Sequence, residues 1–504
     1  MAEVEIFRIN FSGSSIAKNT IYNLLGNIIP AIFALVFIPL LIKGLGTERF
    51  GILSIAWMII GYFSFFDFGI GKGLTKIIAE KIGSNQSDQI AKIFWTSIFL
   101  MVSISLLASV LISFFIPSLV NIFNISKNLR QETTSIFYIL AVAIPIVTSM
   151  TGLRGLLEAH QKFATINIMK VFLGMFTFLG PLLVLLITNS LFWVIVFLVF
   201  IRIVMWILYL LQCLKIQEKI KKEIKIDFKS VTPVLKFSIW ITLGNIIAPI
   251  ILYSDRFLIG VLISVVAITY YVTPYELVTR LLMIPVALSG VLFPIFSASY
   301  VNDPEATKKI FFRGVKFIFL TMYPFILLII TFSYEGIELW LGKDFAIHSS
   351  LILQLLATGI LMNSLSLIPN NFFQGIGKPK IPTLINLIEF PFYILIMWFS
   401  IKFNGIKGAA FAFMIMASID AIIMYIAAHK MSMIKLGSKF YVLPFVIMMF
   451  LLIVPFFMIG FLFKIIFALG FLSIFISVAW KHFFTPEEKL FFIQNFKRYS
   501  FLSN

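Results

Sequence analysis

Fourteen apolar runs follow one another along this chain, each bounded by charged or turn-forming residues. A helix of about 20 apolar residues crosses the hydrocarbon core of a bilayer, so each run is long enough to span a membrane. The 504 residues are 60% hydrophobic and 12% charged, whereas a soluble domain is about a quarter charged. We therefore predict an all-α polytopic membrane protein and exclude a soluble enzyme, a DNA-binding protein and a secreted domain. The predicted spans are 19–42, 50–71, 92–117, 134–157, 166–187, 190–212, 236–262, 268–298, 313–332, 350–374, 383–401, 407–428, 440–459 and 462–480.

The net charge of +18 comes from 40 basic and 22 acidic residues, and most of the basic residues fall in alternate loops. Lys and Arg accumulate in loops that stay cytoplasmic, so this pattern predicts that both termini lie inside. The basic excess is thus an orientation signal, and nucleic acid is not an expected partner. The segment 1–20 carries charges and no apolar core, which predicts targeting by the first span without a cleavable signal peptide. The lone Cys213 excludes an internal disulfide and a cysteine-based metal cluster.

Two pairs of similar segments indicate an internal repeat. The segment 25–30 reads LGNIIP and the segment 243–249 reads LGNIIAP. In the second pair, 157–167 resembles 374–386 at nearly the same offset. An even number of helices per unit predicts two parallel six-helix lobes with a cavity between them near the midplane, plus two C-terminal helices. The predicted parts are an N-lobe at 1–212, a basic cytoplasmic linker at 213–235, a C-lobe at 236–430, and a helix pair with a cytoplasmic tail at 431–504. The linker is either an amphipathic helix on anionic lipid headgroups or a solvated connection.

Five segments carry a resemblance to a known family. They are NTIYNLLGNIIP (19–30), GLGTERFGILS (44–54), FDFGIGKGLTK (66–76), RGLLEAHQKF (154–163) and QGIGKPK (374–380). In order and spacing they resemble the polysaccharide-exporting branch of the multidrug/oligosaccharidyl-lipid/polysaccharide exporter superfamily, and within it the Wzx-type O-antigen flippases.

The resemblance implies transport of an undecaprenyl-diphosphate-linked oligosaccharide from the cytoplasmic to the outer leaflet of the bacterial inner membrane. The cargo would be an O-antigen, capsule or similar repeat unit. A glycan polymerase is an expected partner, and no cofactor is expected beyond Na⁺ or H⁺ for coupling. The first span, 19–42, lacks both the acidic residue common in drug exporters of the superfamily and the arginine typical of its peptidoglycan-precursor flippases.

Cations inside or beside predicted spans are the candidate substrate-binding residues, because charge within the bilayer is costly and usually serves a function. The arginine guanidinium group can bind two phosphate oxygens at once through parallel hydrogen bonds. The candidates are Arg256 and Arg280 in spans 7 and 8, Arg202 in span 6, and Lys72 and Lys76 near the cytoplasmic mouth. For Arg280 the alternative is mutual neutralisation with Glu276, one helical turn away.

Three acidic residues are candidates for ion coupling. Asp420 and Glu389 have no basic residue within a helical turn of either. Asp67 is the third, and for it a local cap or a pairing with Lys72 is an alternative role.

Two other functions compete with the flippase. A cation-coupled multidrug antiporter belongs to the same class. A membrane glycan polymerase or ligase is disfavoured by the short outer loops and by the absence of paired carboxylates or a histidine constellation on the outer side. We therefore predict a transporter that is not an enzyme.

Overall fold

The computed structural model describes residues 13–484, apart from residues 85, 217, 229–231, 233, 235–249, 252, 303, 433–447, 449 and 459, together with residues 486 and 489. Within these residues every regular element is a helix, and nine helices are long and apolar enough to cross a membrane. The predicted all-α membrane fold is confirmed. Much of predicted spans 7 and 13, and the end of the C-terminal tail, lie outside the described residues.

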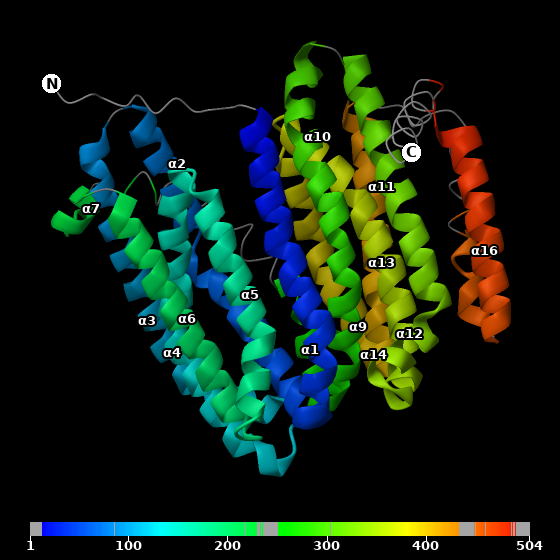
Figure 1. Ribbon diagram of the computed structural model, residues 1–504, viewed down its shortest axis with the longest axis horizontal. Coiled ribbons are helices and arrows are strands. Elements are labelled where there is room, and N and C mark those ends of the chain that lie inside the picture. Colours follow the sequence, from blue (N-terminus) through cyan, green and yellow to red (C-terminus); the bar gives the residue numbers. More distant parts are fainter. Residues whose placement is uncertain are drawn as a thin grey trace, which may run out of the picture. The chain divides into compact units, whose positions relative to one another are not determined.

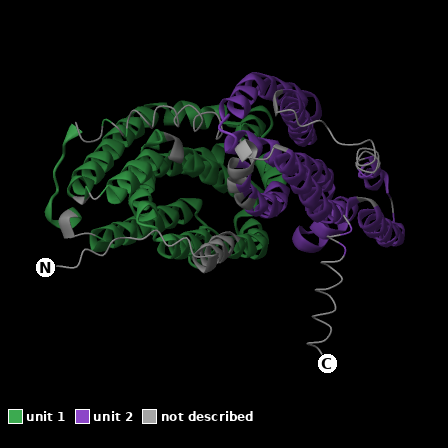
Figure 2. Ribbon diagram, turned by 90° about the horizontal axis from the view of Figure 1, so that it is seen from above, with its two compact units in different colours: residues 1–272 green, residues 273–504 purple. Residues whose placement is uncertain are grey.

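Contacts divide the chain into two compact units, residues 1–272 and 273–504 (Figure 2). In the first unit α4 packs against α2, α3 and α6, while α5 packs against α1 and α6 (Figure 1). Its helices are α1 (Gly13–Tyr62), α2 (Ile70–Gly83), α3 (Ile90–Ile122), α4 (Lys127–Ala159), α5 (Phe163–Leu185), α6 (Leu191–Ile216) and α7 (Glu218–Lys222), with the short helices η1 (Phe63–Asp67) and η2 (Ser87–Gln89).

In the second unit α13 packs against α10, α11, α12 and α14. The helix α9 (Val265–Thr279) begins in the first unit and ends in the second. The remaining elements are η3 (Arg280–Leu282), α10 (Met283–Asn302), α11 (Pro304–Thr331), α12 (Ser333–Leu341), α13 (Lys343–Gly375), α14 (Lys380–Ser432), η4 (Val454–Phe457), α16 (Phe461–Val478) and η5 (Ala479–Phe483). The helix α12 lies in the connection between predicted spans 313–332 and 350–374.

Glycines separate predicted spans within the two longest elements. Gly46 has φ 77° inside α1, and Gly405 has φ 58° inside α14. Positive φ is accessible to glycine at little cost, so each position can turn the chain between two helices. Spans 1 and 2, and spans 11 and 12, are therefore distinct helices as predicted.

The bounds of the helices also repeat along the chain, at nearly the offset that separates the similar sequence segments. The helices α4 and α13 each contain 33 residues, and they begin at Lys127 and Lys343. The second helix of each half is interrupted by a 3₁₀ segment, at η1 (Phe63–Asp67) and at η3 (Arg280–Leu282). These matches support the duplicated unit.

The prediction of one continuous span over 50–71 was wrong. The helix α1 ends at Tyr62, and α2 starts only at Ile70 after η1. Phe68 and Gly69 between them have φ values of 46° and 70°. Two successive left-handed residues cannot continue a right-handed helix, so the chain breaks here.

The described residues of the basic linker do not form one continuous helix. The helix α7 covers Glu218–Lys222, and residues 223–227 are not helical. Trp95 Nε1 on α3 donates a hydrogen bond to the Ile220 carbonyl (2.8 Å), and Asp227 N donates to Thr96 Oγ1 (2.9 Å). The backbone of the linker is thus tied to α3 at two points, before and at the end of the non-helical residues 223–227.

Large apolar side chains lie exposed along the helices. Phe114 is 75% exposed, Leu107 62% and Leu395 55%. Soluble monomers rarely expose extended apolar surface, whereas a membrane protein turns such side chains to lipid. The chain is a multi-pass membrane protein.

Candidate functional site

The helix break in the first unit places an acidic side chain at the start of α2. Asp67 Oδ1 accepts a hydrogen bond from Gly69 N (2.7 Å), and Asp67 Oδ2 accepts one from Thr151 Oγ1 on α4 (3.1 Å). The side chain is only 7% exposed. Asp67 therefore satisfies a backbone donor that the broken helix leaves without a helical partner. This geometry favours the predicted capping role over a pairing with Lys72.

Close helix packing brings α2 and α4 together beside this break. A Cβ atom added to Gly155 on α4 would lie 2.7 Å from the Gly71 carbonyl oxygen and 3.0 Å from Thr75 Oγ1. Small residues allow membrane helices to approach at their backbones. Gly71 and Gly155 thus allow α2 and α4 to pack backbone against backbone at this point.

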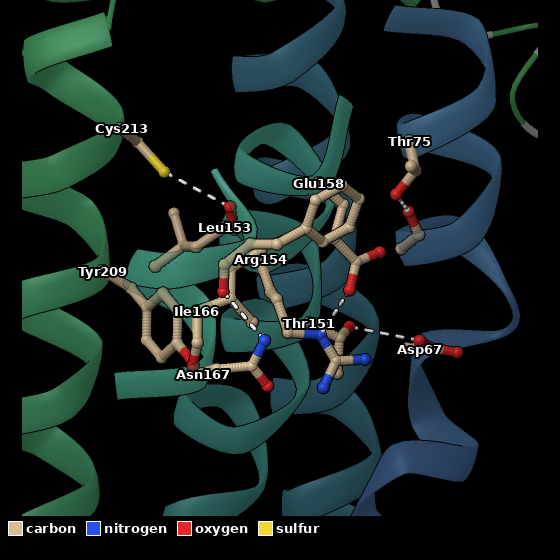
Figure 3. A network of polar contacts seen from close by, with 12 residues as sticks. Asp67, Thr75, Thr151, Leu153, Arg154, Glu158, Ile166, Asn167, Tyr209 and Cys213 are labelled. Carbon is tan, nitrogen blue, oxygen red and sulfur yellow. Dashed lines mark hydrogen bonds and ion pairs between the residues drawn. The ribbon is translucent and has the colours of Figure 1, made fainter. Parts of the chain in front are cut away.

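Three basic residues on three helices are linked through Arg154 and Asp67, and we call them the inner cation cluster: Lys72 on α2, Arg154 on α4 and Lys170 on α5. Lys72 and Arg154 both interact electrostatically with Asp67, and Lys170 interacts with Arg154. All three side chains are exposed. Figure 3 shows the Arg154–Glu158 ion pair and the hydrogen bond between Thr151 and Asp67.

Two carboxylates also contact the cluster. Arg154 Nε lies 3.1 Å from Glu158 Oε1, so the predicted ion pair forms. Asp67 is the second acidic group and interacts with Lys72 and Arg154. Several cations within apolar helices are suited to binding an anion.

Lys170 was not among the candidates predicted from the sequence. It lies within predicted span 166–187 and within the apolar helix Phe163–Leu185. Its position inside an apolar span could have marked it as a candidate from the sequence. Only the packing of α4 beside α5 showed that Arg154 accompanies it.

The predicted cations Arg202 and Lys76 have different surroundings. Arg202 on α6 is 6% exposed and donates from Nη1 to the Leu198 carbonyl (2.9 Å). Lys76 on α2 lies 3.7 Å from Glu80 Oε1, with both side chains about half exposed. Arg202 is therefore a buried charge, whereas Lys76 belongs to a surface ion pair.

Arg256 lies in a buried aromatic and acidic setting in the first unit. It is 4% exposed, and its guanidinium carbon stands 5.3 Å from the centre of the Tyr253 ring. The neighbouring Asp255 accepts hydrogen bonds from Tyr271 OH (2.8 Å) and from Arg256 N (2.6 Å). The cation–π contact stabilises the arginine in place.

Arg280 forms the alternative pairing considered from the sequence. Its Nη2 donates to Glu276 Oε2 at 2.8 Å, one helical turn away. The residue begins η3, so the pair stands at the helix break of the second unit.

Two predicted coupling residues meet in the second unit. Glu389 and Asp420 lie on the two arms of α14, and their carboxyl groups interact electrostatically. Glu389 Oε1 and Asp420 Oδ1 are buried and have no hydrogen-bond partner among the residues that the structure describes. Two carboxylates held close together in an apolar setting repel each other, which favours a proton on one of them.

No group of three His, Cys, Asp or Glu residues that could hold a metal ion occurs in the part of the chain that the structure describes.

The arrangement of two repeated helical units, each with a broken second helix, is that of a membrane transporter. Solved structures share the fold. A multidrug MATE transporter in an inward-facing conformation matches with TM-score 0.67 at 15% identity, over 84% of this chain and 96% of that chain. The lipid II flippase MurJ, in an inward closed conformation, matches with TM-score 0.68 at 16% identity, over 92% of this chain and 99% of that chain.

Sequence comparison then identifies the family. The family model described as "Polysaccharide biosynthesis protein" matches residues 16–300. The chain belongs to this family. A Shigella flexneri protein named "Putative O-antigen transporter" is 28% identical over 415 residues, covering 81% of this chain and 97% of that protein.

Proposed function

We propose that the protein is a flippase that moves a lipid-linked oligosaccharide, built on undecaprenyl diphosphate, from the cytoplasmic to the outer leaflet. The observation that carries this proposal is the inner cation cluster of Lys72, Arg154 and Lys170. A diphosphate is the anion that such a cluster would bind, because several cations can share its oxygens. The family and the lipid-substrate relatives support the same conclusion.

Three of the remaining predicted cations already have contacts within the protein. Arg202 and Arg256 are buried in the first unit and would meet the cargo only if it enters there. Arg280 would have to exchange its contact with Glu276 for a contact with the substrate. Anionic lipids and a glycan polymerase stay predicted partners.

The decisive test is deletion of the gene followed by lipid analysis of the host membrane. The proposal expects undecaprenyl-linked oligosaccharide to accumulate at the cytoplasmic leaflet and surface glycan to disappear. Expression of the intact chain should reverse both changes. If the lipid-linked intermediate does not accumulate, the flippase assignment is wrong.

Substitutions in the cluster test where the diphosphate binds. Lys170→Gln and Arg154→Gln should each weaken binding of undecaprenyl diphosphate about tenfold or more, because each removes a charge-assisted contact. Lys162→Gln is the matched control, since Lys162 is exposed in the connection between α4 and α5 and lies outside the cluster. Equal binding by all three variants would remove the cluster from the proposal.

The carboxyl pair Glu389–Asp420 is the proposed coupling site, and the proton is the proposed ion. Repulsion between two neighbouring carboxylates favours a proton on one of them, whereas Na⁺ would need several oxygen ligands around it. Glu389→Gln should abolish the response of translocation to an imposed pH gradient in proteoliposomes. Unchanged pH-driven transport in this variant, or a strict need for Na⁺ in the intact protein, would refute proton coupling.

A second candidate function, multidrug export, is favoured by the MATE fold. It predicts that the intact chain protects cells against cationic drugs, which drug-resistance measurements on the deletion strain would detect.

A further inference from the structure

The chain after α6 folds back onto α3 in the first unit, through residues 220–228. Ile220 is fully buried in the hydrophobic core, and its carbonyl oxygen accepts a hydrogen bond from Trp95 Nε1 on α3 (2.8 Å). Further along, Asp227 N donates to Thr96 Oγ1 on the same helix (2.9 Å). The helix α7, which contains Ile220, lies at the edge of the first unit (Figure 1). The 220–228 segment is therefore fixed along α3.

The segment meets α3 near the boundary between lipid headgroups and hydrocarbon. The 33 residues of α3 make a helix about 50 Å long, whereas the hydrocarbon core is about 30 Å thick. When the helix is centred, about 10 Å of it extends beyond the core on each side. Trp95 lies roughly 8 Å from the start of α3 at Ile90, and Phe99, whose ring contacts that of Phe228, lies roughly 14 Å from it. The segment thus follows α3 through the level at which headgroups meet acyl chains.

The exposed apolar surface of α3 begins where the segment ends. Residues 90–98 of α3 are buried or half-buried, whereas Phe99, Leu106 and Leu107 are exposed. Phe228 packs edge-on against Phe99, with ring centres 6.3 Å apart, and is itself 56% exposed. Phe228 therefore continues the apolar surface that α3 turns to lipid.

Exposed apolar and basic side chains follow one another in the segment. Ile224 is 67% exposed and Ile226 is 47% exposed, and Lys221, Lys222 and Lys225 are exposed as well. Apolar side chains of this size are more stable among acyl chains than in water, and lysines are attracted to anionic headgroups. This combination is typical of a segment that lies in a membrane interface.

The backbone of the segment limits how deep it can lie. Residues 223–227 are not helical, and irregular backbone that faces lipid does not occur within the hydrocarbon core, where its N–H and C=O groups would have no partners. In the headgroup region water and phosphate groups can complete these hydrogen bonds. The two acidic residues, Glu223 and Asp227, are half-buried, so the exposed charges of the segment are all positive.

We infer that residues 220–228 form an interfacial segment that binds the anionic headgroups of the cytoplasmic leaflet. Its three exposed apolar side chains enter the boundary of the acyl chains, and its three exposed lysines contact the phosphates. The cytoplasmic side follows from the predicted topology, in which the basic linker lies inside. The inference does not depend on the flippase function, because it concerns the phospholipids around the protein and not a transported cargo.

A fluorophore on the segment tests whether it lies in the interface. In the full chain with Cys213→Ser, the environment-sensitive fluorophore NBD is attached to Ile226→Cys, and the protein is reconstituted in vesicles of phosphatidylcholine and phosphatidylglycerol. We expect the emission of an apolar environment and quenching by a phospholipid with a nitroxide near the top of its acyl chain. Lys162→Cys is the matched control, because Lys162 is exposed in the connection between α4 and α5 and should give a water-exposed signal. If the two labels behave alike, the segment is solvated and the inference is wrong.

The choice of lipid tests the role of the lysines. At equal mole fractions, nitroxide-labelled phosphatidylglycerol should quench the Ile226→Cys label about twofold or more as strongly as nitroxide-labelled phosphatidylcholine, because the lysines concentrate anionic lipid beside the segment. This preference should disappear in a variant without the three lysines and persist in one that loses three exposed lysines elsewhere on the predicted cytoplasmic side. The two variants are, respectively, Lys221→Gln/Lys222→Gln/Lys225→Gln and Lys162→Gln/Lys378→Gln/Lys380→Gln. Equal quenching by the two lipids when all lysines are present, or the same preference in both triple variants, would overturn the inference.

Discussion

The ion pair between Lys464 on α16 and Glu335 on α12 connects the C-terminal helix to the rest of the second unit. Lys464 Nζ lies 2.8 Å and 3.0 Å from the two carboxylate oxygens of Glu335. The side chains are 9% and 28% exposed, respectively. Both oxygens face the ammonium group, so the geometry is close to the best that a lysine can offer.

The burial of the two groups sets the expected energy. An exposed ion pair contributes about 0–1 kcal/mol, whereas removing one partner of a fully buried pair costs about 3–5 kcal/mol. Lys464 is nearly buried and Glu335 is partly exposed, so Lys464→Met should destabilise the protein by about 2 kcal/mol. Most of this cost comes from leaving the Glu335 carboxylate in an apolar setting without its partner. Removing both charges should therefore be much less harmful than removing either one.

Thermal unfolding of the purified full chain in detergent measures the four members of this double-mutant cycle. We expect Lys464→Met and Glu335→Leu each to lower the midpoint, and the double variant to cost clearly less than the sum of the two. If the effects of the single variants add within about 0.3–0.5 kcal/mol, the two residues are not coupled and the reasoning fails.

Four further substitutions test the packing, the polar contacts and the pH dependence. Gly51→Ala should destabilise the protein by about 1–3 kcal/mol, because the added Cβ would overlap backbone atoms of Val265. Gly470→Ala is the control and should be neutral or stabilising, because nothing lies within 4 Å of its added Cβ. Equal unfolding midpoints for the two variants would contradict this prediction. Trp95→Phe should cost about 1 kcal/mol because the Ile220 carbonyl loses its donor, and an unchanged midpoint would show that this bond contributes nothing. Burial, and then the nearby positive charge of a lysine, lower the pKa of His160, so the folded protein should lose stability as pH falls below about 6.5. His160→Asn should show a smaller loss in the same pH range, and identical pH profiles would refute this role.

The sequence was sufficient for the class of fold because hydrophobicity over the length of one span is a local property. Each apolar run must span the bilayer or pack against lipid, whatever its neighbours do. The turns at Gly46 and Gly405 could also be predicted from the sequence, since both glycines lie between predicted spans. By contrast, the break at 63–69 was missed, because its residues are as apolar as a continuous span and only Phe68 and Gly69 adopt left-handed conformations.

The candidate site depended on tertiary contacts to a larger degree. Glu389 and Asp420 were each identified as acids within spans, but they come close enough to interact only because the chain turns at Gly405. Lys170 was overlooked, since one lysine in an apolar run has no visible partner until α5 lies beside α4.

The sequence by itself determined that this protein is a helical, multi-pass membrane protein with an internal repeat, because both the length of each apolar run and the repeated segments can be read directly from the order of the residues. Tertiary structure alone decided which charges meet. It gathered Lys72, Arg154 and Lys170 from three helices, and it joined Asn124 to a turn far along the chain, at Val261 and Ile263. The physical reason is that the hydrophobic effect acts on each segment separately, whereas hydrogen bonds and charge pairs depend on distances of a few ångströms between segments.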